Sequence, residues 1–361
     1  MIRYSNIKFS LNMKKLIISL DGGTGNQLFQ LLACDNLARK FSRKPFYSVE
    51  RLGKFRDLEI KKIADLLDIK FFDTKNIKKI RLITESDLCH PAYFSHYSEV
   101  PLIKQEEVLL NGFFQNYRMH DKKTIKKLRN FSKKEAQLIY PDSNYIALHI
   151  RELQGTWKGK PKKDIDKLSI KYYERSLEQI KIISRENESF ASINNVLLFS
   201  DMFNNLSKSI LFEPVTELIK SKGFNVILGD NLCKTPWQSI SLMSNARCVI
   251  TANSTFSWWG AYLSNNLCFS PILSLWEPLL MTPDDWIQIS DSKLEPFTWH
   301  KEMIYQVSAN LKKERFSTIK KQYYESFIAK LLKWPLRSLY IKLSRNLINK
   351  YANLKLRSLL S

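Results

Sequence analysis

The segment Cys248-Val-Ile-Thr-Ala-Asn-Ser-Thr-Phe-Ser-Trp-Trp-Gly-Ala-Tyr-Leu263 predicts a buried strand that runs directly into a helix. Residues 248–250 are an apolar run typical of a strand, and residues 253–255 are of the types that cap helix starts. Because a first helical turn has unpaired backbone N–H groups, it attracts anions such as phosphate. Phe256 and the pair Trp258-Trp259 add aromatic faces beside that position. A capped core helix with inward-packed tryptophans is the alternative interpretation.

Apolar strands and helical segments alternate along the rest of the chain, which favours α/β domains with parallel sheets. A basic, turn-containing segment at about 118–144 marks the expected domain junction. We therefore predict an α/β domain at 13–140, a second at 141–305 and a basic helical tail at 306–361. In such folds, ligands bind at the carboxyl ends of strands. The expected strands are 16–20, 145–150, 195–199, 224–228 and 247–251, and the expected helices are 26–41, 169–184, 205–222 and 236–245.

The composition is that of a globular protein with room for two domains, since 361 residues include 44% apolar and 12% aromatic side chains. No run approaches the ~18 apolar residues of a membrane span. The apolar run at 16–20 is too short for the core of a signal peptide. The five cysteines form no CxxC pair, so we expect reduced thiols, a cytoplasmic location and no metal site.

Half of the net charge of +22 lies near the carboxyl terminus, because residues 311–361 contain 13 Lys and Arg but only two acids. Apolar residues recur there at helical spacing, which predicts a basic amphipathic helix. Such helices bind anionic membranes, so we expect peripheral contact with the inner face of the cytoplasmic membrane through 320–361. A helix packed on its own domain is the alternative. Without zinc-finger spacing or an RNA-binding aromatic signature, we expect no nucleic-acid partner.

Three more segments at expected strand ends carry groups that suit a nucleotide. The glycines of Gly22-Gly-Thr-Gly25 allow a close backbone approach, although such turns are common. His149 and Arg151 project the same way from a strand, and an Arg fork suits a diphosphate, although pairing with a neighbouring acid is commoner. The carboxylate of Asp201 can accept from a guanine edge or a ribose, or it can cap the following helix.

Taken in order, these segments resemble the motifs of the bacterial α-1,2-fucosyltransferases, glycosyltransferase family 11. The resemblance spans about 14–275 and rests on Gly22-Gly-Thr-Gly-Asn-Gln-Leu-Phe-Gln30, His149-Ile-Arg151, Ser169-Ile-Lys-Tyr-Tyr173, Phe199-Ser-Asp201 and Asn253-Ser-Thr-Phe-Ser-Trp-Trp-Gly-Ala261. It implies a GT-B-type fold of two facing Rossmann-like domains, in which the domain at 13–140 is on the acceptor side and the domain at 141–305 binds the GDP-sugar. It also implies inverting transfer from GDP-β-L-fucose, without metal or cofactor, to an α-linked product.

Three positions depart from the usual family pattern. Glu152-Leu-Gln154 stands where the family usually has Arg-Gly-Asp, Met202 stands where a second acid is frequent, and Thr24 stands where Leu is usual. Because of these departures, a transferase that uses another GDP-sugar or forms another linkage is an alternative. A non-catalytic protein that binds glycans or nucleic acid is a second alternative. A metal-dependent enzyme holding its ion at Asp164-Ile-Asp166 is a further alternative.

The resemblance and the chemistry together assign roles to single residues. Arg151 would stabilise the leaving diphosphate, and Asp21 or Glu152 would accept the proton of the attacking hydroxyl, unless the phosphate itself does so. The acceptor is expected to be an oligosaccharide or lipid-linked glycan, with transfer α-1,2 to galactose in a bacterial surface polysaccharide such as O-antigen. The expected substrate-binding residues are Gly23, Gly25, Asn26, Gln27, His149, Ser200, Asp201, Asn253, Ser254, Thr255 and Phe256.

Overall fold

The computed structural model of the chain describes residues 14–52, 60–74, 80–85, 107–152, 156–157, 160–161, 168–271, 283, 285–289 and 291. The chain divides into two compact units, Met1–Thr124 and Ile125–Ser361. The division falls inside helix α5 (Lys122–Ile139) and within the expected junction at 118–144. The expected tail at 306–361 and the alternative metal motif at 164–166 lie outside the described residues.

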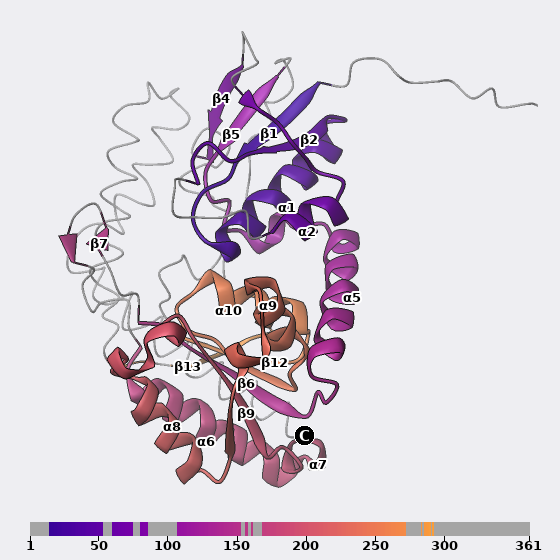
Figure 1. Cartoon of the computed structure of the whole chain (residues 1–361). Helices are drawn as coiled ribbons and strands as arrows, with labels where there is room; N and C mark the ends of the chain where they lie inside the picture. Colours follow the sequence, from indigo (N-terminus) through magenta and orange to yellow (C-terminus); the bar gives the residue numbers. More distant parts are fainter. Residues whose placement is uncertain are drawn as a thin grey trace, which may run out of the picture. The chain divides into compact units, whose positions relative to one another are not determined.

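Unit 1 is built on a five-stranded parallel sheet with the strand order β3-β2-β1-β5-β4 (Figure 1). The central strand β1 is an apolar run whose residues Leu16 to Ile18 are fully buried, as expected for a parallel strand covered on both faces. The elements are β1 (Lys15–Ser19), α1 (Thr24–Lys40), β2 (Lys44–Ser48), α2 (Lys61–Leu66), β3 (Lys70–Phe71), β4 (Arg81–Thr84), β5 (Val108–Asn111) and the 3₁₀ turn η2 (Tyr117–Met119).

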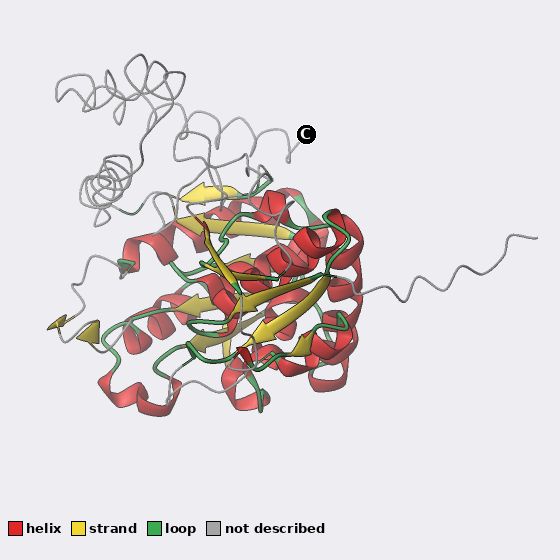
Figure 2. Ribbon diagram, turned by 90° about the horizontal axis from the view of Figure 1, so that it is seen from above, coloured by secondary structure: helices red, strands yellow, loops and turns green. Residues whose placement is uncertain are grey.

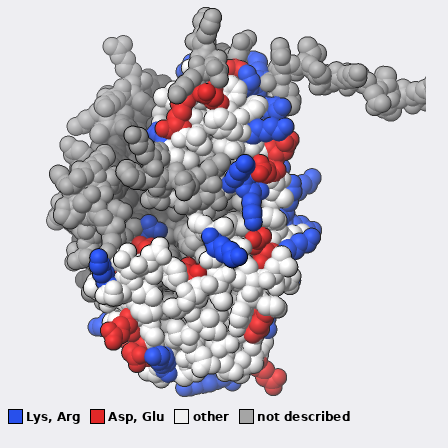
Figure 3. All heavy atoms as spheres, in the orientation of Figure 1, with Lys and Arg blue, Asp and Glu red and all other residues white. Residues whose placement is uncertain are grey.

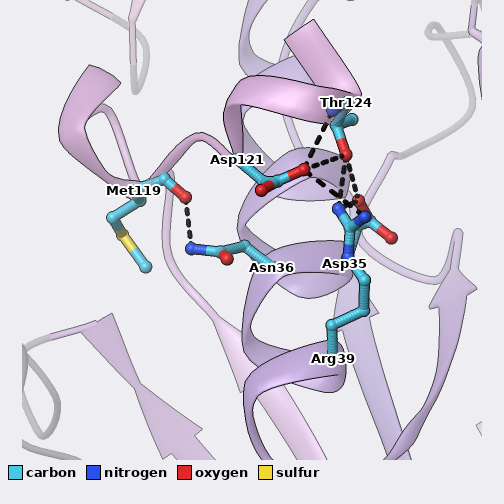
Figure 4. A network of polar contacts seen from close by, with 6 residues as sticks. All are labelled: Asp35, Asn36, Arg39, Met119, Asp121 and Thr124. Carbon is cyan, nitrogen blue, oxygen red and sulfur yellow. Dashed lines mark hydrogen bonds and ion pairs between the residues drawn. The ribbon is translucent and has the colours of Figure 1, made fainter. Parts of the chain in front are cut away.

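Polar contacts join α1 to the start of α5 within unit 1 (Figure 4). Asp121 caps the first turn of α5, because its Oδ2 accepts the backbone N–H of Thr124 at 2.9 Å. This N–H donor lowers the pKa of Asp121. Arg39 of α1 donates to the carboxylate of Asp35 and to Thr124 Oγ1, and that hydroxyl lies 3.1 Å from Asp35 Oδ2. The first turn of α5 is therefore fixed to α1 by side chains of both helices.

Unit 2 is built on a six-stranded parallel sheet with the order β10-β9-β6-β11-β12-β13, and helices flank the strands (Figure 2). Helices α6 and α8 lie on one side of it and α9 and α10 on the other (Figure 1). The strands are β6 (Tyr145–Ile150), β9 (Asn195–Ser200), β10 (Asn225–Leu228), β11 (Cys248–Ile250), β12 (Leu267–Pro271) and β13 (Ile287–Ile289), besides the short antiparallel pair β7 (Thr156–Trp157) and β8 (Lys160–Pro161). The helical elements are α6 (Ile170–Glu186), α7 (Glu188–Ala191), η4 (Phe203–Lys208), α8 (Phe212–Ser221), η5 (Gly229–Leu232), α9 (Pro236–Asn245) and α10 (Thr255–Ser264).

These elements confirm the expected fold class of two α/β units with parallel sheets, but the single helix expected at 205–222 is wrong. The structure has the 3₁₀ turn η4 and then the separate helix α8. Asn205 has non-helical backbone angles, and the backbone N–H groups of Ile210 and Leu211 donate to the side chain of Glu152. Because a distant carboxylate takes these donors, the helix begins anew at Phe212.

The strand order reverses once in the sheet of unit 2. In unit 2 the chain runs from β6 outward through β9 to β10, and then returns to β11 on the other side of β6 before it reaches β12 and β13. In unit 1 the chain runs from β1 through β2 to β3, and then from the opposite edge strand β4 inward to β5. At a reversal such as that between β6 and β11, connections leave the two strands in opposite directions, which opens the crevice where α/β proteins bind ligands.

Gly229 lies where β10 meets the ring of Phe199 from β9. A Cβ at this position would stand 2.4 Å from Cζ of that ring, which is far inside van der Waals contact. We expect Gly229→Ala to lower the free energy of unfolding by about 1–3 kcal/mol through overpacking. Urea denaturation measures the loss. The double variant Gly229→Ala/Phe199→Leu should recover part of it, and strictly additive losses would contradict the contact.

Candidate functional site

The reversal between β6 and β11 brings Arg151 and Ser254 together. Arg151 follows β6 directly, and its Nη1 donates to Ser254 Oγ at 2.6 Å. Ser254 is the N-cap of α10, since its Oγ also accepts the backbone N–H of Phe256 at 3.2 Å. The expected helix start after residues 248–250 is thereby confirmed. A guanidinium and a helix N-terminus both place positive potential at this point, which suits an anion.

The turn before α10 is held by its own backbone and by Ser257. The N–H of Ser254 donates to the carbonyl of Ala252 at 2.8 Å, and Ser257 Oγ accepts the N–H of Ala252 at 3.1 Å. Asn253 is buried, while Thr255 is half-buried. Because Trp258 and Trp259 are buried and pack edge to face with ring centroids 5.1 Å apart, the core packing of the tryptophans is confirmed. The helix start can still present its polar groups at the sheet edge.

The paired tyrosines of α6 hold the carboxyl ends of both strands. Tyr172 Oη donates to the carbonyl of Thr251 at 2.7 Å, and Tyr173 Oη donates to the carbonyl of His149 at 3.3 Å. Both rings are fully buried. These bonds fix the two strand ends to one helix.

His149 is buried beneath the site, and its ring centroid lies 5.7 Å from that of Phe256. Burial, and then the positive charge of Arg151, lower the pKa of His149 to about 3. The imidazole is therefore neutral at physiological pH. We therefore interpret His149 as a residue that packs against the site, while Arg151 provides the positive charge of the site.

The end of β9 adds Ser200 and Asp201 to the same edge. Asp201 is exposed, and its Oδ1 accepts the N–H of Glu152 at 2.9 Å. The N–H of Ser200 donates to Oδ2 of Asp230 at 2.8 Å, and Ser239 Oγ lies 3.4 Å from Oδ1 of the same residue. Burial raises the pKa of Asp230 to about 6. The sequence interpretation missed Asp230, although an acid after Gly229 at a strand end was the available signal.

Glu152 occupies a different place from the one expected of a proton acceptor. Its side chain is fully buried, and its carboxylate accepts from Ser209 Oγ, from the N–H of Ile210 at 3.1 Å and from the N–H of Leu211 at 3.0 Å. These groups precede α8, where negative charge is favourable. We therefore interpret Glu152 as a positioning residue that ties the end of β6 to the start of α8.

In unit 1, the glycine-rich turn forms a tight connection between β1 and α1. Gly22 has φ of +76°, and an added Cβ would stand 2.5 Å from Asn26 Nδ2, so this position requires glycine. Gly23 is the extended N-cap of α1, and Gly25 is buried in its first turn. Gln27 is buried and donates to the carbonyl of Gly22 at 3.0 Å, so it supports the turn from below.

Of the two expected proton acceptors, Asp21 is the one with a partly exposed carboxylate. Arg51 Nη2 donates to Asp21 Oδ2 at 3.1 Å, and Arg51 Nη1 donates to Asn111 Oδ1. Asn26 Oδ1 accepts from Gln115 Nε2 at 3.0 Å. The sequence interpretation missed Arg51, Asn111 and Gln115, since none belongs to a motif. The expected residues thus gather in two groups, one at the β1/β5 edge of unit 1 and one at the β6/β11 edge of unit 2.

The described residues also provide observations on surface charge, membrane-spanning helices and metal ligands. Basic and acidic side chains are interspersed on the face that Figure 3 shows. Within the part of the chain that the structure describes, no helix has the length and apolar character needed to cross a membrane. Among the same residues, no group of three or more His, Cys, Asp or Glu side chains is arranged to hold a metal ion.

Removing the Glu152 carboxylate should destabilise unit 2. Glu152→Ala leaves two backbone N–H groups and a hydroxyl without their acceptor, so we expect a loss of about 1–3 kcal/mol in the free energy of unfolding. Glu178→Ala is the control, because it removes an exposed carboxylate whose ion pair with Lys222 is worth ~0–1 kcal/mol. Urea denaturation compares the two variants, and equal losses would overturn the positioning role.

The raised pKa of Asp230 predicts a pH-dependent stability. Between its ordinary value of 3.8 and about 6, the folded protein holds a proton that the unfolded chain releases, so this contribution falls as pH rises through that window. Asp230→Asn should therefore gain about 1–3 kcal/mol relative to the wild type between pH 4 and pH 7. Denaturation at both pH values measures this difference. His149 acts in the opposite direction in both proteins and cancels. Parallel pH profiles would contradict the assignment.

One curated protein is similar in sequence, while no family model matches the chain. An α-1,2-colitosyltransferase from Escherichia coli is 24% identical over 276 residues, which cover 70% of this chain and 89% of that protein. The sequence similarity to this sugar-transferring enzyme therefore extends over most of the length of both proteins.

Solved structures with a related arrangement of elements include three proteins. POFUT1 in complex with GDP has a TM-score of 0.42 and 11% identity, over 78% of this chain and 99% of that one. The fucosyltransferase NodZ from Bradyrhizobium has a TM-score of 0.40 and 12% identity, over 69% and 93%. The heptosyltransferase WaaC from E. coli with ADP has a TM-score of 0.39 and 11% identity, over 81% and 99%.

Proposed function

We propose that this protein is a glycosyltransferase of the GT-B type that transfers a sugar from a GDP-sugar to a glycan hydroxyl. The observation that carries the proposal is the Arg151–Ser254 contact at the carboxyl edge of an all-parallel sheet, where its strand order reverses. The sequence similarity to an α-1,2-colitosyltransferase supports it independently. The finer proposal is inverting transfer of L-fucose from GDP-β-L-fucose, α-1,2 to galactose of a bacterial surface polysaccharide.

The reaction needs a site that stabilises a leaving diphosphate. Cleavage of the sugar–phosphate bond leaves new negative charge on GDP while the sugar becomes oxocarbenium-like. Arg151 would bind the β-phosphate, and Ser254, Thr255 and the N–H groups that begin α10 would bind the same diphosphate. Fixed donors of this kind are typically worth ~2.7–4 kcal/mol each in the transition state, because they need no reorganisation. The groups around Ser254 are held by hydrogen bonds and burial before any ligand arrives.

Asp201, the exposed residue that follows β9, is proposed to bind the nucleoside. A carboxylate can accept two hydrogen bonds from the N–H groups of a guanine edge, and Asp201 is an exposed carboxylate at the same sheet edge as Arg151. Its Oδ1 is oriented by the N–H of Glu152. Phe256 is half-buried in the first turn of α10 and would pack on the transferred sugar.

We propose Asp21 as the acceptor of the proton from the attacking hydroxyl. Its carboxylate is partly exposed and is oriented by Arg51, whereas the carboxylate of Glu152 is buried and bound to the start of α8. General-base assistance requires a carboxylate that a substrate hydroxyl can reach. The diphosphate itself stays the alternative proton acceptor.

A colitosyl donor is the second candidate, because the curated relative is named for colitosyl transfer. The diphosphate site described above does not distinguish it from a fucosyl donor. Competition between the two donors in one transfer assay, followed by analysis of the product linkage, assigns the sugar and its configuration.

The diphosphate role of Arg151 can be tested directly. Arg151→Ala should lower the rate of GDP release from the preferred donor by roughly 10²–10³-fold, and Arg151→Lys should recover only part of it, since Lys lacks the planar fork. The assay contains EDTA, because the proposed reaction uses no metal. Stabilisation of the protein by GDP, measured by thermal shift, should fall in parallel.

Arg185→Ala is the matched control, because it removes an exposed arginine from α6 of the same unit. It should retain wild-type GDP release and GDP stabilisation. Arg151→Ala with near-wild-type rates would remove the diphosphate role. A wild-type protein that ignores GDP and instead binds DNA in a salt-sensitive way would replace the proposed function altogether.

A further inference from the structure

We infer that the exposed face of helix α5 binds an anionic membrane surface, a partner that the proposed function does not require. All the lysines of this helix are exposed, and together they form the lysine face: Lys122, Lys123, Lys126, Lys127, Lys133 and Lys134. Blue side chains lie along α5 at the right of Figure 3. The lysine face belongs to the described part of the chain and is separate from the membrane contact expected through 320–361.

The charged side chains of α5 are sorted between two sides of the helix. Its one glutamate, Glu135, is half-buried and accepts from Nε2 of Gln238 in α9 at 3.1 Å. Its one arginine, Arg129, is half-buried and donates to the carbonyl of Tyr262 in α10 at 2.9 Å. Because the structure describes all of α5, its exposed side can be said to contain six lysines and no acid of the same helix.

This concentration of one charge is unfavourable for the helix itself. Lys122 and Lys126 are four positions apart, as are Lys123 and Lys127, and like charges at this spacing destabilise a helix. Lys122 and Lys123 also lie in the first turn, where the helix dipole disfavours positive charge. A partner of opposite charge removes this repulsion, whereas contact with solvent alone does not explain why the lysines are gathered on one side.

Other helices of unit 2 have the usual mixture of charges on their exposed sides. The exposed residues of α6 include Lys171, Glu178 and Arg185. On α8, Glu217 and Lys220 are both exposed and form an ion pair at 2.9 Å. The lysine face is therefore a feature of α5 and does not simply follow from the basic composition of the chain.

The lysine face is supported by a helix that is fixed to the core of unit 2. Ser132 Oγ lies 2.6 Å from Ser244 Oγ of α9, and the ring of Phe131 stacks on that of Trp237 with centroids 5.8 Å apart. Leu128 is fully buried. The lysines thus follow one helix of 18 residues, which is roughly 27 Å long. A row of charges of this length suits an extended anionic surface.

Two features favour a lipid surface over a nucleic acid. The charges of the exposed side of α5 are all lysines, and clusters of four or more bases on an amphipathic helix bind anionic headgroups. Leu138 follows Lys134 by one turn and is 86% exposed. An apolar side chain beside lysines suits the boundary between headgroups and acyl chains, whereas a phosphate backbone has no apolar surface for it. The partner that fits is an anionic bilayer.

Sedimentation of the full chain with lipid vesicles tests this surface without any donor. We expect binding to vesicles of phosphatidylglycerol mixed with phosphatidylcholine, and weak binding to phosphatidylcholine alone. The lysine-face variant Lys126→Gln/Lys127→Gln/Lys133→Gln/Lys134→Gln should lower the partition coefficient roughly 100-fold, because each lysine near an anionic surface contributes about fivefold. Glutamine has a helix propensity close to that of lysine, so α5 should persist.

A charge-matched control variant removes the same number of positive charges from exposed positions of unit 2 outside α5: Lys171→Gln/Arg185→Gln/Lys220→Gln/Arg247→Gln. It should retain vesicle binding within about threefold of wild type, because exposed charges more than a Debye length away are largely screened. Thermal unfolding first verifies that both variants fold. Both should also keep the full thermal shift with GDP.

Four outcomes would overturn the inference: no binding to anionic vesicles, equal binding to both kinds of vesicle, a lysine-face variant that binds like wild type, or an equal loss in the control variant. Salt-sensitive binding of duplex DNA that the lysine-face variant loses, without vesicle binding, would also overturn it and assign the face to nucleic acid. Vesicle binding through the lysine face in a protein without any GDP shift would keep this surface but reject the GDP-sugar transferase.

Discussion

The constraint on which the rest of unit 2 depends is the reversal of strand order between β6 and β11. Both strands are buried along their whole length, and apart from Tyr145 and His149 their side chains are aliphatic or a cysteine. Polar chemistry is therefore confined to the carboxyl ends, where the connections leave in opposite directions. The hydrogen bond from Arg151 to Ser254 spans this point and joins the end of one strand to the helix that follows the other.

Buried polar groups keep this edge in place. Tyr172 and Tyr173 bond to the carbonyls at the ends of β11 and β6, while Asp230 accepts the N–H of Ser200 at the end of β9. Glu152 fixes the segment before α8. Each of these bonds satisfies a group that would cost free energy if it were buried alone. Together they hold several strand ends in the fixed geometry that stabilisation of a leaving group requires.

Local patterns predicted the elements whose causes are local. The helix at 236–245 was predicted with its observed bounds, and its cap is Thr235 followed by a proline. The strand at 145–150 is one continuous buried run. The break at Ser209 could not be predicted, because its cause is the carboxylate of Glu152, more than fifty positions earlier. The same limit applies to Glu152 itself, since a sequence does not show whether an acid is buried.

The sequence motifs did not identify some residues at the two sheet edges, because the partners of those residues are also distant in the sequence. Arg51 is bound to groups that lie 30 and 60 positions away, and Asp230 is bound to Ser200 30 positions away. No neighbour in the sequence marks Arg51, and only the preceding glycine, Gly229, marks Asp230. The order of the motifs predicted the two groups of residues at strand ends. The hydrogen bonds show that Gln27 and Glu152 support a turn or a strand end. Asp21 and Asp201, in contrast, have polar groups that solvent can reach.

The central claim is that the β6/β11 edge binds the diphosphate of a sugar nucleotide. A crystal structure of the full chain with GDP tests it most directly. The account predicts that the β-phosphate lies within hydrogen-bonding distance of the Arg151 guanidinium and the first turn of α10, with the base beside Asp201. A diphosphate bound elsewhere, such as at the β1/β5 edge, with Arg151 still bonded only to protein atoms, would contradict it.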